Sequence, residues 1–387
     1  MQEMKISKIS FFPTALKLLF AAIAACIAAL ILAVPPPFYP AGANERKASA
    51  AGDYDYNKRW KLYEELTKNY KRAGALEILD EIESNAGREK NYPMQWKALI
   101  FKICRESANY FDLIDSFEKR LSNSPAVIRP LLKLIAADLY LCYFDTRGYR
   151  SVGREPVPAA PGEFDLNSCG ASSLLDRISS IYADLLGDPG PRDIKLSLYS
   201  CMISAGNLFG FVDKTLYDMI VWKAADLFRS NITFFAYSTG RFEVSSDSFV
   251  FSPVEDFMAY EIGIIKRGEF RLAAAKIIQD LLKFHYGRRN MKNFIESDIR
   301  RLDYFNQIAA GRTFTVYEKR LGEIARKYDR GEPGAAGAAL LFTALSRYKN
   351  GDLEAAYKIA CEVLEKYKGS EAAAICPALI DKIKSKE

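Results

Sequence analysis

The sequence predicts an all-α fold, an irregular tetratricopeptide-like solenoid of antiparallel helix pairs. Apolar residues recur at steps of three and four residues along most of the chain after residue 53, which is the periodicity of an amphipathic helix. Signals for β-strands are almost absent, and one helical pattern occurs twice in the second half of the chain. With 49% hydrophobic and 26% charged residues, the 387-residue chain is expected to bury a sizeable core.

The first helical block is predicted over residues 53–145. Its first helix pair is marked by apolar positions at helical spacing: Trp60, Tyr63, Leu66 and Tyr70, then Leu76, Leu79 and Ile82. A third helix is expected around Trp96–Ile103 and a fourth over Leu113–Leu121. Ser124 and Pro125 then have the residue types of an N-cap and a first-turn proline, so a fifth helix is expected to begin there.

A Pro- and Gly-rich loop is predicted at residues 146–171, before a second helical block at 172–387. Helices are expected in this block at 172–186, 191–206, 213–229, 254–266, 269–286, 291–309, 314–329, 335–349, 352–367 and 371–385. Between the third and fourth of these, the alternation around Phe242 and Val244 fits a short hairpin or an extended arm laid on the helices. We favour the arm.

The second block contains an internal similarity. A glycine followed five residues later by alanine and thirteen later by leucine occurs at Gly351, Ala356 and Leu364, and again from Gly268. This is the skeleton of a tetratricopeptide second helix, with Ala344 at the small position of the first helix. The spacing between the copies is not a whole number of such repeats, so an irregular solenoid is expected.

The amino terminus has the pattern of an export signal or a membrane anchor. Three lysines precede an uninterrupted apolar run at residues 18–34, and a Pro- and Ala-rich stretch follows. Residues 1–34 are therefore predicted to be a signal peptide or membrane anchor, and residues 35–52 a flexible tether. Cleavage after Ala43, an uncleaved anchor and lipidation at Cys26 all remain open. The body is expected at the periplasmic face of the cytoplasmic membrane or in the periplasm, in contact with the membrane through this segment.

Composition argues against several classes of function. The formal net charge of +6 lies partly in the first 52 residues, so there is no dense basic patch for nucleic acid. The single histidine, His285, excludes a His-rich metal site and any two-histidine mechanism. We expect it at a helix end, in a capping or solvent-exposed role. No catalytic residue, metal ligand or cofactor site is predicted, and the chain is not expected to be an enzyme.

Charged clusters are expected to be solvated helix faces. The carboxylate pairs Asp112 with Asp115 and Asp176 with Asp184 lack an identifiable pocket. The basic pairs at 288–289 and 300–301 have the residue types that meet phospholipid headgroups, but a solvated face is the favoured interpretation.

Cysteine spacing points to one candidate disulfide. None of the seven cysteines forms a CxxC pair. Cys361 and Cys376 are equally far from the turn expected near Lys368 and Gly369, so they are predicted to lie level on antiparallel helices. A disulfide between them, or two buried thiols, fits this placement, and bridging requires Cα atoms within about 7 Å.

Five stretches resemble one family in their order along the chain. They are DYDYNKRWKLYEELTKNYKRAGALEILDEI at 53–82, SPAVIRPLLKLIAADLYLCYF at 124–144, KTLYDMIVWKAADLFRS at 214–230, FVFSPVEDFMAYEI at 249–262 and YKNGDLEAAYKIACEVLEKY at 348–367. Together they resemble the amino-terminal helical region of Bacteroidetes-type alpha-2-macroglobulin family proteins. The resemblance implies a scaffold that belongs to a protease trap, with macroglobulin domains encoded downstream as partner.

The chain departs from that family in the parts that trap proteases. The macroglobulin β-sandwich domains, the bait segment and the Cys-Gly-Glu-Gln thioester are not found, and the nearest sequence, at Cys169 and Gly170, lacks the Glu and Gln. A truncated or split product and a stand-alone relative both fit. The expected function is a non-catalytic cell-envelope scaffold and protein-interaction module. The alternative is an independent tetratricopeptide-like periplasmic binding protein with its own peptide or envelope partner.

Overall fold

The computed structural model describes residues 54–147, 164, 166, 169–203, 214–236, 242–309 and 311–385. Within these residues the regular elements are helices, apart from one isolated antiparallel bridge between Lys195 and Thr215, which confirms the all-α class. The predicted signal or anchor at 1–34, the tether at 35–52, Cys26 and most of the loop at 146–171 lie outside the described residues.

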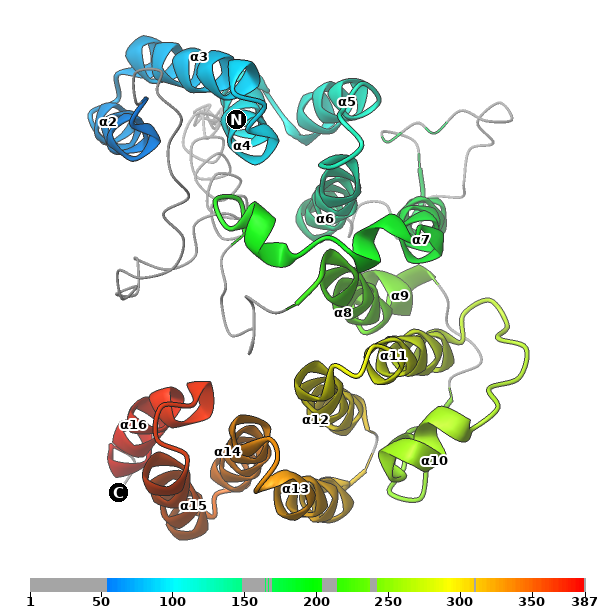
Figure 1. The fold of residues 1–387 in the computed structure, drawn as a ribbon. Helices are drawn as coiled ribbons and strands as arrows, with labels where there is room; N and C mark the ends of the chain where they lie inside the picture. The colour runs from blue at the N-terminus through cyan, green and yellow to red at the C-terminus, as the bar shows by residue number, and fades with distance from the viewer. Residues whose placement is uncertain are drawn as a thin grey trace, which may run out of the picture. The chain divides into compact units, whose positions relative to one another are not determined.

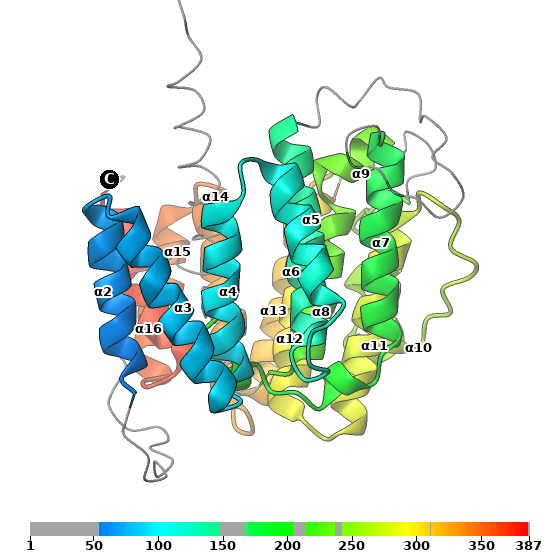
Figure 2. The same cartoon turned by 90° about the horizontal axis from the view of Figure 1, so that it is seen from above.

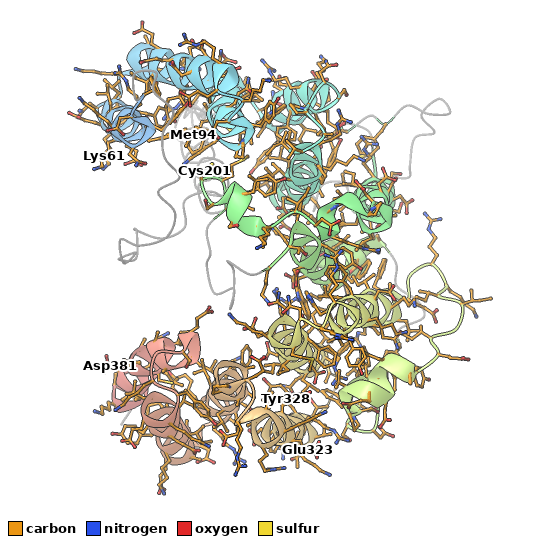
Figure 3. The ribbon with its side chains drawn as sticks, viewed as in Figure 1. Lys61, Met94, Cys201, Glu323, Tyr328 and Asp381 are labelled. Carbon is orange, nitrogen blue, oxygen red and sulfur yellow. The ribbon has the colours of Figure 1, made fainter. Side chains whose placement is uncertain are left out.

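The chain divides into two compact units. Unit 1 comprises Met1–Thr146 and Ser197–Leu208, and unit 2 comprises Arg147–Leu196 and Phe209–Glu387. The short segment Ser197–Leu208, which we had expected within the second helical block, therefore groups with the first unit. Side chains occupy the space between neighbouring helices within each unit (Figure 3).

Unit 1 is built from consecutive packed helices (Figure 1). They are α2 (Tyr56–Lys68), α3 (Arg72–Arg88), α4 (Tyr92–Glu106), α5 (Tyr110–Leu121) and α6 (Arg129–Arg147). The stripe predicted from Tyr63, Leu79 and Ile82 is buried and forms one core with Ala75, Ile78 and Ala98. Tyr70 and Lys90, with φ of 56° and 54°, make the sharp turns after α2 and α3.

The predicted start of the fifth helix was wrong. Ser124 does not cap α6, because its hydroxyl donates a 2.7 Å hydrogen bond back to the Leu121 carbonyl and so closes α5. A turn follows, and α6 begins at Arg129, with Pro130 in its first turn. A serine before a proline suits the end of one helix as well as the start of the next, and only the packing distinguishes them.

Unit 2 contains the remaining helices (Figure 2). They are α7 (Ala171–Gly187), α8 (Leu216–Phe228), α9 (Asn231–Ala236), α10 (Val254–Ala259), α11 (Phe270–Gly287), α12 (Met291–Ile308), α13 (Phe314–Tyr328), α14 (Pro333–Lys349), α15 (Leu353–Lys366) and α16 (Glu371–Lys384), with the 3₁₀ turns η2 (Gly190–Arg192) and η5 (Phe249–Phe251). A third 3₁₀ turn, η3 (Leu196–Tyr199), crosses the boundary between the units. Helix α11 packs on α8 and α12, and α13 to α16 pack as consecutive neighbours.

Two predicted helices were wrong. Residues 191–206 were expected to be helical, but their first part extends from η2 and pairs with the segment before α8. The Leu196 amide donates to the Lys214 carbonyl at 2.9 Å, and the Leu216 amide to the Ile194 carbonyl at 2.7 Å. The helix expected at 254–266 ends at Ala259 as α10, because the chain turns extended at Tyr260, with φ −64° and ψ 127°.

The repeat pattern is confirmed at the carboxyl end and only partly at its earlier copy. Gly351, with φ of 83°, turns the chain between α14 and α15, and the small residues Ala344 and Ala356 are fully buried, as predicted. Gly268 also has a positive φ, 96°, and precedes α11. The residues before it are extended, however, so the earlier copy lacks the first helix of its pair.

Candidate functional site

The arm predicted between the helices expected at 213–229 and 254–266 is only partly correct, because its first residues, Asn231–Ala236, form the helix α9. The described residues 242–253 do lie on the helices, and basic side chains hold their backbone. Arg301 of α12 is about 1% exposed and donates to the Val250 carbonyl at 2.7 Å and the Ser252 carbonyl at 3.1 Å. Arg320 of α13 donates to the Phe251 carbonyl at 2.8 Å. These bonds give the arm carbonyls the hydrogen-bond donors that a neighbouring strand would supply in a hairpin. Within the described residues the arm forms no hairpin.

The expectation of a solvated basic face at 300–301 was wrong. Arg301 pairs with the buried Asp298 at 2.7 Å and stacks over Phe257, with its guanidinium carbon 4.4 Å from the ring centroid. Arg300 lies 4.3 Å over the Trp222 ring, and burial lowers its pKa to about 10. Both guanidinium groups therefore take part in packing within unit 2.

His285 is also placed differently from the expectation. It lies in the last turn of α11, but it is about 1% exposed and its Nε2 lies 2.8 Å from Oδ1 of Asp218. Asp218 is the acidic member of the capping box of α8, because its other carboxylate oxygen accepts bonds from the Thr215 amide at 3.0 Å and hydroxyl at 2.7 Å. Burial by itself would raise the pKa of the Asp218 carboxyl. The hydrogen bond and charge of His285, the charge of Lys214 and the bond from the Thr215 amide together outweigh burial and lower this pKa.

This histidine–aspartate pair is structural in its setting. Both residues are buried, and no serine or cysteine nucleophile is joined to the ring in the described residues. The pair ties the amino end of α8 to the carboxyl end of α11. The bond to Asp218 gives this buried histidine a hydrogen-bond partner.

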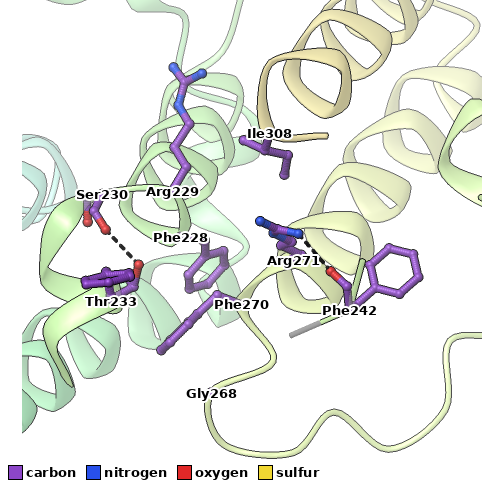
Figure 4. A pocket seen from close by; sticks show the side chains of 10 residues that line it. Phe228, Arg229, Ser230, Thr233, Phe242, Gly268, Phe270, Arg271 and Ile308 are labelled. Carbon is purple, nitrogen blue, oxygen red and sulfur yellow. Dashed lines mark hydrogen bonds between the residues drawn. The ribbon is translucent and has the colours of Figure 1, made fainter. Parts of the chain in front are cut away.

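An open pocket lies where α8 meets α9, beside the start of α11 (Figure 4). Its volume is about 300 Å³. Among the described residues it is lined by four phenylalanines, two arginines, two hydroxyl side chains, one isoleucine and one glycine: Phe228, Phe234, Phe242, Phe270, Arg229, Arg271, Ser230, Thr233, Ile308 and Gly268. All of them belong to unit 2.

The aromatic wall of the pocket is built by α8 and α11 together. The rings of Phe228 and Phe270 are stacked, with centroids 5.8 Å apart and an interplanar angle of 28°. Phe234 of α9 is 59% exposed, which is unusual for so large an apolar side chain beside a cavity. The wall therefore offers apolar surface to a ligand.

The charge inside the pocket comes from Arg271. Its guanidinium points toward Phe242, to whose carbonyl Nη1 donates at 3.1 Å (Figure 4). The Arg229 guanidinium extends away from the phenylalanines, toward Asp226 at 2.7 Å and the Gln307 side chain at 2.7 Å. Nη1 of Arg271 is used in the bond to the arm carbonyl of Phe242. The other N–H groups of its guanidinium have the geometry to donate to a carboxylate in the pocket.

The hydroxyl groups of the pocket act as acceptors. Ser230 donates to the Leu227 carbonyl at 2.6 Å, and Thr233 donates to the Ser230 carbonyl at 2.7 Å. Their hydrogens are thus used within the α8–α9 turn, while their oxygen lone pairs stay available. The pocket combines an apolar aromatic wall, one inward cation and two acceptors, a combination that suits the binding of a ligand.

The two cysteines of the candidate disulfide are free thiols in the structure. Cys376 is buried in α16 and donates to the Ala372 carbonyl at 3.3 Å. Burial, together with a smaller effect of the neighbouring Cys361 of α15, raises the pKa of its thiol to about 11. Helices α15 and α16 are packed neighbours, so the structure brings the pair together and the disulfide remains a prediction.

The predicted carboxylate pairs lie on exposed faces. Asp115 forms an ion pair with Lys119 one turn away at 2.6 Å, and Asp176 with Arg267 at 2.5 Å. Neither pair lines the pocket described above. Within the described residues no group of His, Cys, Asp or Glu is arranged to hold a metal ion. None of the helices in that part of the chain combines the length and apolar character needed to cross a bilayer.

Sequence reasoning did not find the pocket residues. They come from four helices, α8, α9, α11 and α12, and from the arm and the turns beside these helices, and no fixed spacing joins them. The one available signal was the aromatic-rich stretch at 228–242, which we had assigned to the arm. Comparisons with protein-family models, curated proteins and solved structures find no match to this chain.

Proposed function

We propose that this chain is a non-catalytic helical scaffold of the cell envelope that binds a partner protein through unit 2. The observation that carries the proposal is the pocket between α8, α9 and α11, with its stacked Phe228 and Phe270, the exposed Phe234 and the inward Arg271. An aromatic or aliphatic side chain of the partner fills the apolar part. A neighbouring carboxylate of the same segment pairs with Arg271.

The test uses the full-length chain and short blocked peptides that carry one Phe beside one Glu. Fluorescence anisotropy of a labelled peptide should report saturable binding. Arg271→Gln should weaken binding about tenfold, because a charge-assisted bond is lost. Phe234→Ala should weaken it by a similar factor through lost apolar contact, without harm to the fold, since this ring is 59% exposed.

Matched controls keep this test specific. Arg288→Gln removes a cation of α11 outside the pocket that pairs with Asp193 at 2.7 Å, so it should leave binding unchanged. A peptide with Lys in place of Glu should bind weakly. Equal binding by all variants, or no binding of the Phe–Glu peptides, would reject the pocket as the site.

The envelope location rests on the apolar run at residues 18–34, which follows three lysines. A reporter enzyme that is active only outside the cytoplasm, fused after residue 53, should be active. A reporter that is active only inside the cytoplasm should stay silent at the same position. The opposite pattern would overturn the proposed location and the membrane contact, whatever the pocket binds.

The resemblance to alpha-2-macroglobulin family proteins suggests macroglobulin domains as the partner, and an independent peptide or envelope partner is the alternative. The DNA downstream of this chain separates the two. A continuing frame or adjacent gene for β-sandwich domains, whose product co-purifies with this chain and is released by Phe234→Ala, supports the first.

A further inference from the structure

The turn between α2 and α3 presents an aromatic side chain to solvent. Tyr70 is 95% exposed, and its backbone has a φ of 56°, in the left-handed region that favours glycine. A bulky residue in this conformation costs conformational energy, and this ring recovers none of it by packing, because almost all of its surface is in water. Neither the backbone geometry nor burial therefore explains a tyrosine at this position.

Lys71, the next residue, also departs from what the local structure favours. It is the N-cap of α3, a position that prefers Ser, Thr, Asp or Asn, and its side chain makes no capping bond. The first turn of α3 contains no acidic residue and begins with Arg72, although the positive end of a helix dipole disfavours cations. Successive exposed residues that break local preferences indicate a role outside the fold.

The turn between α3 and α4 is a matched comparison within the same unit. Lys90 has the same left-handed conformation, with a φ of 54°. In both turns the next amide donates to the carbonyl five residues back, at 2.9 Å for Lys71 and 2.8 Å for Asn91. Asn91, however, is a regular N-cap, whose side chain accepts a bond from an α4 amide at 3.3 Å. The turn geometry thus permits a normal cap, and the α2–α3 turn lacks one.

The residues on either side of Tyr70 are free cations. Lys68 and Lys71 are exposed, and neither forms an ion pair with another described residue. Arg72 is used within the unit, because its Nη2 donates to the Arg105 carbonyl at 2.5 Å. This bond places the start of α3 at the end of α4. Tyr70 therefore projects between two ammonium groups that are available to an anionic partner.

A second exposed aromatic side chain lies at the same end of unit 1. The α2–α3 and α4–α5 turns are at one end of the unit (Figure 2). Phe111, in the first turn of α5, is 37% exposed. Two aromatic side chains on separate turns suit a flat, deformable surface better than a single pocket of a partner protein. A lipid surface has this form, and anionic headgroups complement the lysines.

We propose that this end of unit 1 binds the headgroup layer of a membrane that contains anionic phospholipid. The Tyr70 ring lies at the interface between headgroups and acyl chains, where tyrosine is favoured. The ammonium groups of Lys68 and Lys71 pair with lipid phosphates. An apolar segment at 18–34 that holds the chain at a membrane keeps unit 1 within reach of this surface. The contact goes beyond the pocket in unit 2 and does not depend on it.

The experiment measures acetylation of the lysines in the full-length chain by a water-soluble reagent, read by mass spectrometry at increasing vesicle concentration. Vesicles of phosphatidylcholine with phosphatidylglycerol should slow acetylation of Lys68 and Lys71 about tenfold, because the anionic surface holds both ammonium groups. Lys90, which is exposed on the comparison turn, should react at an unchanged rate. Vesicles of phosphatidylcholine alone, or free glycerol phosphate, should protect none of the three.

The variant Tyr70→Gly separates membrane contact from folding. It should leave the midpoint of thermal unfolding unchanged or slightly higher, because glycine adopts a positive φ without strain. It should nevertheless reduce the protection of Lys68 and Lys71 about threefold or more, since the interfacial ring is lost. Lys90→Gly makes the same backbone change at the comparison turn and should leave this protection intact.

Charge reversal completes the test. Lys71→Glu should reduce the protection of Lys68, because it places a carboxylate against the anionic headgroups, whereas Lys90→Glu should not. Acetylation of Lys68 and Lys71 that is indifferent to anionic vesicles at every concentration, equal protection of Lys90, or full protection in Tyr70→Gly would each overturn the proposal. Protection that appears without lipid as the protein concentration rises would assign this end to contact between copies of the chain instead.

Discussion

Two regions of unit 2 are held together by different means. Around the arm, the charged side chains of α12 and α13 reach backbone carbonyls at 250–252, and Arg301 is almost completely buried. In the repeat region, α13 to α16, the contact of α14 with α15 is made mainly by small side chains, and α14 buries a run of alanines with Gly337. The first region depends on a few specific long-range bonds, and the second on many short contacts repeated along the helices.

The two regions should differ in how strongly the substitution of a single residue lowers stability. An Arg in the arm region satisfies several buried groups at once, so its loss leaves unpaired charge and unpaired carbonyls. A small residue in the repeat region contributes little by itself, but it sets how closely two helices approach. Gly337 illustrates this, because a Cβ at that position would lie 3.0 Å from the Tyr367 ring.

The largest expected effect comes from Arg301. Arg301→Ala should lower the free energy of unfolding by about 3–5 kcal/mol, because it leaves Asp298 buried without its partner. Chemical denaturation measures the loss, and hydrogen exchange should show earlier opening of residues 249–257. The double variant Arg301→Met with Asp298→Leu should recover only part of the stability, because it removes the unpaired charge but leaves the Val250 and Ser252 carbonyls without a donor. The exposed Arg330→Ala should change little. A loss below about 1 kcal/mol would show that the bonds of Arg301 to Asp298 and to the arm carbonyls contribute little to stability.

The candidate disulfide would add a covalent link to the repeat region. If Cys361 and Cys376 are bridged after export, reduction should cost about 3 kcal/mol, the value expected for a closed loop of about 15 residues. Alkylation followed by mass spectrometry should find both thiols blocked before reduction and reactive after it. Cys361→Ser should remove the difference between oxidised and reduced stability. Reactive thiols at both positions in the exported chain would rule out the bridge.

The Asp218–His285 pair, which joins α8 to α11, gives the stability of unit 2 a pH dependence. Because the pKa of Asp218 is lowered below its ordinary 3.8, its contribution is complete above that value and is lost as pH falls through the folded-state pKa. Asp218→Asn should therefore cost about 2 kcal/mol near neutral pH and progressively less in acid. Unfolding curves across pH measure this gap. A gap that stays constant into acid would contradict the assignment, and the exposed Asp256→Asn is the control.

The smallest effect is expected at the close approach of α14 to Tyr367. Gly337→Leu should cost about 1–3 kcal/mol, because the added side chain must displace a buried ring. Gly334→Ala in the same helix has no atom near the added Cβ, so it should be neutral or slightly stabilising. Thermal or chemical unfolding compares the two. Equal stability of both variants would show that the ring moves aside freely.

Most helices could be predicted because their signals are local. The stripes of α2 to α5 and of α11 to α16 repeat at helical spacing, and turn glycines such as Gly351 mark where the chain reverses. Prediction failed where a contact distant in sequence competes with the helix. Pairing with the strand-like residue Lys214 keeps 194–196 extended, and the stacking of Tyr260 on Phe249 accompanies the early end of α10.

The candidate site was predictable only in its general nature. The lack of a metal-ligand or nucleophile motif in the sequence led us to expect a binding module. The sequence does not show that Phe228, Phe270 and Arg271 face one cavity. For the same reason Arg301 was expected on a solvated face and His285 in a capping or solvent-exposed role at a helix end, although both side chains are buried. The local sequence around a charged residue on a helix does not show whether the folded structure places a buried partner beside it.

The sequence by itself determined the all-α class, most helix positions in both units and the small residues at the α14–α15 turn, since each depends on periodicity or on backbone freedom within a few residues. Tertiary structure decided which charges are buried, which carbonyls the arm offers to Arg301 and Arg320, and where the pocket opens. These depend on pairs of groups far apart in the chain. Their burial is favourable only when both partners are in place.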